Sequence, residues 1–233
     1  MVLSPEEWSA LALSARVAFW CTVLGLVPGV ALAWLLARCE FVGKALLDSV
    51  VHLPMVLPPV VPGYMLLLTF GHQGWLGAFL ERWLGVSVAF HWTGAVLASL
   101  VMGLPLQVQP IRLAFQLVDA RLEGAARTLG AGPWRVFFTI SLPLAMPGLL
   151  VGAILAFSRS LGEFGATITF VGNIEGETRT LPLAIYTYVS QPGGEAPAMR
   201  LILVSVALAL AALMASNALT RRAQRALGYR DHA

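Results

Sequence analysis

The sequence predicts an all-α polytopic membrane protein with about five transmembrane helices plus cytoplasmic coupling helices. Of its 233 residues, 58% are hydrophobic and only 12% are charged, against roughly 45–50% and about 25% in soluble domains. So few charges cannot cover the surface of a soluble domain of this length. Basic residues stand in short clusters between apolar runs, which is typical of membrane proteins and not of nucleic-acid grooves. We therefore expect a lipid bilayer, and no nucleic acid, around this chain.

Five apolar stretches are long enough to span a bilayer, since a spanning helix takes about 20 residues. A fifth stretch, 147–171, qualifies only if it tolerates Arg159 and Glu163. The other four qualify plainly and cover residues 11–37, 45–70, 92–115 and 201–219. We expect the whole chain, 1–233, to form a single transmembrane domain.

The distribution of basic residues predicts the orientation. The segments on one side of the five spans hold ten Lys and Arg residues, whereas those on the other side hold Arg82, Arg179 and Arg200. Lys and Arg are concentrated in cytoplasmic segments. We therefore expect the N-terminus outside and the C-terminus in the cytoplasm.

Two shorter segments are expected outside the bilayer core. The apolar residues of 75–83 share one helical face, which predicts a short helix lying in the outer membrane interface. Residues 181–189 are apolar but too few to span. This run is either re-entrant or flat on the surface.

The second and third spans are rich in proline. Pro54, Pro58, Pro59 and Pro62 fall within nine residues, and each proline removes a helical hydrogen bond. One interpretation is a kink packed against neighbouring helices. The other is a broken helix beside a transport pathway. In the third span Pro105 and Pro110 alternate with two glutamines, so the pathway or gate candidates here are Pro54, Pro58, Pro59, Gln107 and Gln109.

Signatures of catalysis and metal binding are missing from the sequence. Gly43-Lys44 is followed by Ala45 and lacks the leading glycine of a phosphate-binding loop. The four histidines are scattered, and no Gly-x-Ser-x-Gly turn occurs. We expect no catalytic residue, no metal site and no cofactor on this chain, which is therefore not an enzyme by itself.

Residues 119–143 form the most informative cytoplasmic segment. Asp119 is placed to cap a helix whose small and apolar residues recur at helical spacing up to Leu129. The stretch 130–133 ends this helix and begins another, which carries the aromatic face Trp134, Phe137 and Phe138. These rings pack either against the inner ends of the spans or against a separate cytoplasmic subunit.

This segment resembles the cytoplasmic coupling loop of ABC importer permeases, whose pattern is Ala-Ala-x3-Gly-x9-Ile-x-Leu-Pro. One position departs, because Gly124 stands where the pattern has Glu and Glu123 precedes it. A shift of one residue turns a helical side chain by about 100°. The resemblance implies coupling helices that sit in a cleft of an ATP-binding subunit, with Glu123, Ala125, Ala126, Gly130, Trp134, Phe137, Ile140, Leu142 and Pro143 as the coupling residues.

Further stretches are similar to molybdate permeases of bacterial inner membranes, with sulfate permeases as close relatives. They are residues 41–44, 52–60, 126–130, 158–165 and 176–180. The resemblance implies a homodimer in the inner membrane with two cytoplasmic ATP-binding subunits, which use the ATP, and a periplasmic oxyanion-binding protein. It implies uptake of molybdate, and of tungstate equally well. The alternatives are a sulfate or thiosulfate importer and, from another class, an ion-coupled secondary carrier.

Arg159 and Glu163 are four residues apart within an apolar run, where unpaired charges are expensive. One interpretation is an ion pair that fixes the helix against its neighbours. The other is that Arg159, with Ser158 and Ser160, offers hydrogen-bond donors to a passing oxyanion. Both interpretations make Ser158, Arg159, Ser160 and Glu163 candidates for the pathway.

Overall fold

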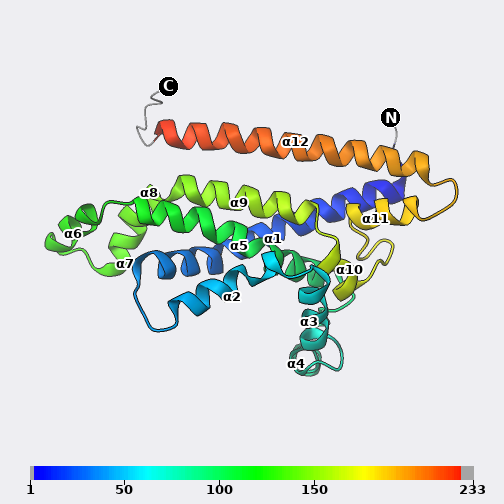
Figure 1. Cartoon of the computed structure of the whole chain (residues 1–233), viewed down its shortest axis with the longest axis horizontal. Helices are drawn as coiled ribbons and strands as arrows, with labels where there is room; N and C mark the ends of the chain where they lie inside the picture. Colours follow the sequence, from blue (N-terminus) through cyan, green and yellow to red (C-terminus); the bar gives the residue numbers. More distant parts are fainter. Residues whose placement is uncertain (1–2, 227–233) are drawn as a thin grey trace.

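The computed structural model describes residues 3–226, and within them the chain is helical without a strand (Figure 1). The C-terminal residues from 227 on, including Arg230 of the predicted cytoplasmic tail, lie outside the described residues. The elements are α1 (Pro5–Arg38), α2 (Lys44–Val56), α3 (Val60–Phe70), α4 (Trp75–Leu84), α5 (Trp92–Leu117), α6 (Ala120–Thr128), α7 (Pro133–Val136), the π-helix η1 (Phe137–Ser141), α8 (Leu142–Leu144), α9 (Met146–Leu161), α10 (Gly165–Val171), α11 (Leu181–Val189) and α12 (Glu195–Ala226).

The predicted spans are present in two forms. Three described helices are long and apolar enough to cross a membrane, namely α1, α5 and the part of α12 from Glu195 to Ala215. Two further pairs of shorter helices satisfy the same criteria only together, and each pair is sharply bent. They are Lys44–Val56 with Val60–Phe70 and Pro133–Leu144 with Met146–Leu161. Five spans result if each bent pair crosses once, in agreement with the predicted number.

Neither 45–70 nor 147–171 is one continuous helix. A break in the first is one of the two interpretations given for its prolines, whereas the end of the second at Leu161 is not predicted. The first is broken between α2 and α3, which meet at an angle of 111°. The break falls at residues 57–59, where Pro58 and Pro59 remove two backbone donors. The second ends at Leu161, and α10 begins at Gly165 after an irregular turn. The prediction of a single helix missed this turn because apolar composition alone does not reveal it.

The core of the bundle consists of α1, α5 and α9, which lie side by side (Figure 1). Small residues allow these helices to approach closely, as is typical of packing in membranes. A Cβ added at Gly148 would lie 2.6 Å from the carbonyl oxygen of Pro110, and one at Gly152 would lie 2.6 Å from that of Gln107. Backbone therefore touches backbone where α9 crosses α5.

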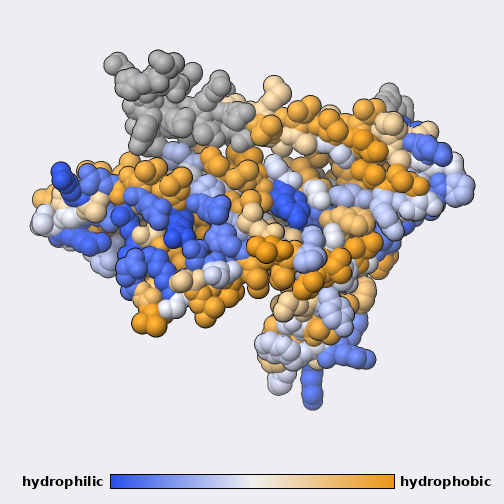
Figure 2. Space-filling view, viewed as in Figure 1, coloured by the Kyte–Doolittle hydropathy of each residue, from blue (hydrophilic) through white to orange (hydrophobic). Residues whose placement is uncertain are grey.

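Helix α12 is attached to this core near its own N-terminal end. There Arg200 donates two hydrogen bonds to Oε1 of Glu7, at 2.7 and 3.1 Å, and Glu7 is fully buried. Further along, α12 exposes Leu203, Val206 and Leu210, and Figure 2 shows a hydrophobic surface over this helix. An apolar exposed helix of this kind is stable only where lipid or another protein covers it.

The two breaks lie against each other. Helix α3 packs on α10, and a Cβ at Gly63 would lie 2.7 Å from the carbonyl oxygen of Ala166. A Cβ at Gly165 would lie 2.6 Å from Cβ of Pro59. The proline-rich break is therefore a broken helix that is packed against its neighbour, and its place beside a transport pathway stays a prediction.

We predict that Gly63→Ala destabilises the protein, because the added methyl group meets backbone that cannot rotate away. Overpacking of this kind costs about 1–3 kcal/mol, so the variant should melt at a lower temperature in detergent. Gly124→Ala is the matched control, since a Cβ at Gly124 has no atom within 4 Å. Equal melting temperatures for Gly63→Ala and the wild type would contradict the close α3–α10 contact.

Candidate functional site

The coupling segment 119–143 folds as two helical pieces joined by a tight turn. Asp119 caps α6, since its Oδ1 accepts a hydrogen bond from the backbone N–H of Arg121 at 2.9 Å. The chain leaves α6 through Gly130, whose φ of 85° suits glycine. Helix α7 then begins with Pro133. The helix end and the second helix start are therefore where the sequence predicts them.

Glu123 is the only buried residue of α6. Its Oε1 lies 3.0 Å from Nη2 of Arg38, at the end of α1, and accepts a hydrogen bond of 2.8 Å from the Ser141 hydroxyl. Arg38 Nη2 also donates to the carbonyl oxygen of Val118, which follows α5, at 2.9 Å. We call this group of Arg38, Glu123, Ser141 and the Val118 carbonyl the loop anchor.

The outer face of α6 is open. Leu122 is 49% exposed and Leu129 is 88% exposed. Ala125 is exposed and Ala126 half-buried, and a Cβ at Gly124 would project into empty space. A carboxylate at position 124 would therefore point outward, whereas Glu123 points back toward the spans. This is the consequence of the one-residue departure from the family pattern.

The three aromatic residues do not share one environment, because one ring packs on the spans and two remain exposed. Phe137 packs against Phe115 and Trp34 of the bundle, with ring centroids 6.1 and 6.0 Å apart. Trp134 and Phe138 stack on each other but remain 75% and 59% exposed. All three line one side of an apolar groove of about 890 Å³, whose other side is formed by α1 residues including Trp34. The two exposed rings are therefore not covered by any described residue of the chain.

The last part of the segment joins the loop to the fourth span. Ile140 and Leu142 are half-buried, and Leu142 packs on the core near the C-terminal end of α5. Pro143 is exposed. Residues Phe137–Ser141 form a π-helix, an irregular turn that is frequent at functional sites. The chain then bends by 67° into α9.

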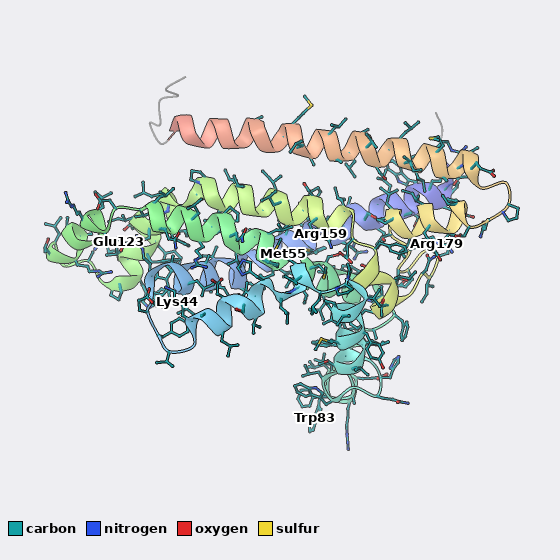
Figure 3. All side chains as sticks on the ribbon, in the orientation of Figure 1. Lys44, Met55, Trp83, Glu123, Arg159 and Arg179 are labelled. Carbon is teal, nitrogen blue, oxygen red and sulfur yellow. The ribbon has the colours of Figure 1, made fainter. Side chains whose placement is uncertain are left out.

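Several of the residues predicted to line the pathway or gate lie near the two helix breaks. Pro54 lies within α2, and Pro58 and Pro59 are exposed at the bend after it. The break between α9 and α10 contacts this bend through Pro59 and Gly165. Figure 3 labels Met55, near the end of α2, and Arg159, near the end of α9, in the same central region.

Arg159 and Glu163 form the ion pair that their spacing predicts. Nη1 of Arg159 lies 2.7 Å from Oε2 of Glu163. The Glu163 side chain is 1% exposed and that of Arg159 is 30% exposed. The other oxygen of Glu163, Oε1, accepts a hydrogen bond of 2.8 Å from the backbone N–H of Ala166. The carboxylate therefore fixes the start of α10, while part of the guanidinium remains accessible.

The neighbouring serines do not join Arg159 on one surface. Ser158 is exposed and lines a cavity of about 330 Å³ between α9, α11 and α12, and Arg159 is not among the lining residues of this cavity. Ser160 is buried. Of the polar candidates at the end of α9, Arg159 is therefore the one that combines charge with access.

The two glutamines of α5 occupy different positions. Gln107 is 1% exposed, and its Nε2 donates to the carbonyl oxygen of Thr22 at 3.2 Å. A Cβ at Gly25 would lie 2.5 Å from Oε1 of Gln107, so this side chain fills the contact between α1 and α5. Gln109 lies on an exposed surface of α5. Gln109 alone has the access that a pathway residue needs.

Sequence reasoning missed Arg38 and Ser141 as parts of the site. Arg38 entered the prediction only as one of the charges that set the orientation. A glutamate on a loop packed against apolar spans needs a cationic partner, but the sequence alone does not say which basic residue that is. Arg38, at the end of the first span, is a basic residue that the fold brings to Glu123.

The comparisons with known proteins agree over nearly the whole chain. Residues 29–230 match the family described as "Binding-protein-dependent transport system inner membrane component". The molybdenum transport system permease protein ModB of Escherichia coli K12 is 58% identical over 221 residues, or 95% of this chain and 96% of that protein. The protein of the same name from Haemophilus influenzae is 52% identical over 95% of this chain and 97% of its own length.

A solved structure supports the fold. A bacterial ABC transporter involved in the import of the acidic polysaccharide alginate matches 94% of this chain and 80% of its own, with a TM-score of 0.75 and 16% sequence identity. At this identity the likeness concerns the helical fold alone. The match to the family model spans most of the chain. This chain belongs to the family of binding-protein-dependent transport system inner membrane components.

Proposed function

We propose that this chain is the transmembrane permease subunit of an ATP-driven importer that moves molybdate, and tungstate equally well, into the bacterial cytoplasm. The observation that carries the proposal is the 58% identity to a molybdenum transport system permease over 95% of the chain. The coupling segment supports it, because α6 and α7 present Leu122, Leu129 and Trp134 uncovered.

ATP hydrolysis is assigned to separate subunits. The chain lacks a phosphate-binding loop, and no cofactor is proposed for it. One of the two cytoplasmic ATP-binding subunits docks on the outer face of α6 and on Trp134 and Phe138 of each permease copy. These apolar side chains are 49–88% exposed, so a partner that covers them gains hydrophobic free energy.

A second copy of the chain completes the pathway. Five spans enclose little space for a hydrated tetrahedral dianion, so a two-fold pair is needed to surround it. A periplasmic oxyanion-binding protein delivers the anion to the outer side. In a sulfate or thiosulfate importer, the alternative, the second permease is a different chain.

Arg159 keeps this pathway from repelling its substrate. A lone carboxylate near the path of a dianion is unfavourable, and Glu163 carries such a charge at the α9–α10 break. The 2.7 Å ion pair with Arg159 neutralises it. In this proposal the pair is structural, and the serines and backbone groups of the pathway do not distinguish molybdate from tungstate.

Labelling of single cysteines tests the orientation. In a variant lacking Cys21 and Cys39, cysteines at Ser4 and Asn173 should react with an impermeant thiol reagent added outside, because both lie at the outer ends of spans. A cysteine at Gly130 should react only after the membrane is opened. Outside labelling of position 130 would contradict a periplasmic N-terminus.

A double-mutant cycle tests the role of Arg159. Arg159→Ala leaves Glu163 buried and unpaired, so molybdate uptake should fall by about tenfold or more. Glu163→Ala combined with Arg159→Ala should recover part of that uptake, because no charge is then left uncompensated. The assay is initial uptake rate in proteoliposomes. A double variant as inactive as Arg159→Ala would show instead that Arg159 meets the anion.

Competition between anions tests the substrate. Proteoliposomes that hold the permease, its ATP-binding subunit and the periplasmic binding protein should take up labelled molybdate only with ATP. Equimolar tungstate should reduce this uptake about twofold, the value for an equal competitor, and equimolar sulfate should leave it unchanged. Uptake abolished by equimolar sulfate would contradict the molybdate assignment and favour the sulfate alternative.

A further inference from the structure

The loop anchor joins four parts of the chain that are distant in sequence. Arg38 ends α1, the Val118 carbonyl follows α5, Glu123 lies in α6 and Ser141 ends η1. Each connection is a direct hydrogen bond or ion pair of 2.8–3.0 Å. The anchor therefore contacts the inner ends of two spans and both halves of the coupling segment.

Apart from this anchor, α6 is weakly held. Glu123 is its only buried residue, and the apolar side chains Leu122 and Leu129 face away from the bundle. Figure 3 shows Glu123 on α6 at the far end of the molecule, beyond the inner ends of α5 and α9. Few apolar contacts between α6 and the spans are therefore available to transmit a movement of α6.

We infer that Arg38 and Glu123 are positioning residues for coupling, which pass a displacement of α6 directly to the inner ends of α1 and α5. This inference rests on the proposed function, in which the ATP-binding subunits move α6. The shift of the glutamate from position 124 to 123 is what makes it possible. At 124 the carboxylate would face outward, whereas at 123 it reaches Arg38.

The geometry of the loop anchor is suited to passing a displacement of α6 to the spans, and not only to holding α6 in place. A single carboxylate oxygen, Oε1 of Glu123, accepts from both Arg38 and Ser141, so these two partners move with one atom. Arg127 lies 3.9 Å from the other oxygen, and its side chain is 63% exposed, so it adds little. Charge-assisted hydrogen bonds are directional and short, which suits a connection that transmits position.

The test measures molybdate ions taken up per ATP hydrolysed by the reconstituted complex. Glu123→Gln keeps the size of the side chain and an oxygen for Ser141 but removes the charge. We expect this variant and Arg38→Met each to lower the ratio about tenfold, within the range of typical coupling energies. The double variant should be no worse than either single one, because both remove the same connection.

An exposed ion pair on the same side of the molecule provides the matched control. Lys44 Nζ lies 2.7 Å from Oε1 of Glu40, which is 88% exposed. Exchanging these two charges should leave the ratio at its wild-type value. The exchange Arg38→Glu with Glu123→Arg should restore part of the ratio lost in the single variants. If any change of charge near the inner surface disturbed transport, the Lys44–Glu40 exchange would also lower the ratio. The Arg38–Glu123 exchange would then not restore it.

A merely structural role gives a different outcome. Glu123→Gln would then lower the melting temperature of the purified permease while the uptake per ATP stayed at the wild-type value, which would overturn the inference. Additive losses in the double variant would overturn it too. If Glu123→Gln does not assemble, Arg38→Lys is the deciding variant. It keeps the charge with fewer donors, so a lowered ratio supports the inference and a wild-type ratio contradicts it.

These results are separable from the proposed function. Failure of the wild-type complex to take up molybdate contradicts the substrate assignment. The role of the loop anchor is then tested by the stimulation of ATP hydrolysis by the binding protein. In that assay we expect Glu123→Gln to lose the stimulation while the ATP-binding subunits still copurify. Unchanged stimulation would overturn the inference whatever the substrate.

Discussion

The contact between Arg38 and Glu123 is the constraint on which the arrangement of the segment 119–143 depends. It brings together the ends of α1 and α5 and the two halves of the coupling segment. A buried glutamate without its cation is strongly unfavourable, so Glu123 is stable in this position only with Arg38 beside it. Because α6 contributes no buried apolar side chain, its place relative to the spans is fixed by polar contacts. The opposite face of α6 is thereby left exposed.

The spans themselves are organised by small residues and by helix breaks. Glycines at 148 and 152 let α9 touch the backbone of α5, and Gly63 lets α3 touch α10. The same close contacts bring the proline bend of the second span against the turn that Glu163 stabilises in the fourth. The two irregular segments therefore pack directly against each other. An accessible guanidinium, that of Arg159, lies beside them.

Much of this could be predicted from the sequence, because apolar length and turn residues are local signals. The helices starting after Asp119 and at Pro133, the number of spans and the Arg159–Glu163 pair all follow from spacing. The break after Leu161 and the burial of Gln107 could not be predicted in this way. Both depend on which helix lies opposite, and periodicity does not contain that information. Arg38 was missed for the same reason, since Glu123 is 85 residues away in sequence.

The central claim is that α6 and the inner ends of α1 and α5 move as one unit through the anchor. Amide hydrogen exchange of the reconstituted complex, compared with and without ATP, measures this directly at residues 33–38, 113–118 and 120–128. The account predicts that protection changes in all three segments together in the wild type. It predicts a change confined to 120–128 in Glu123→Gln. Changes in all three segments of that variant, equal to those of the wild type, would contradict the account.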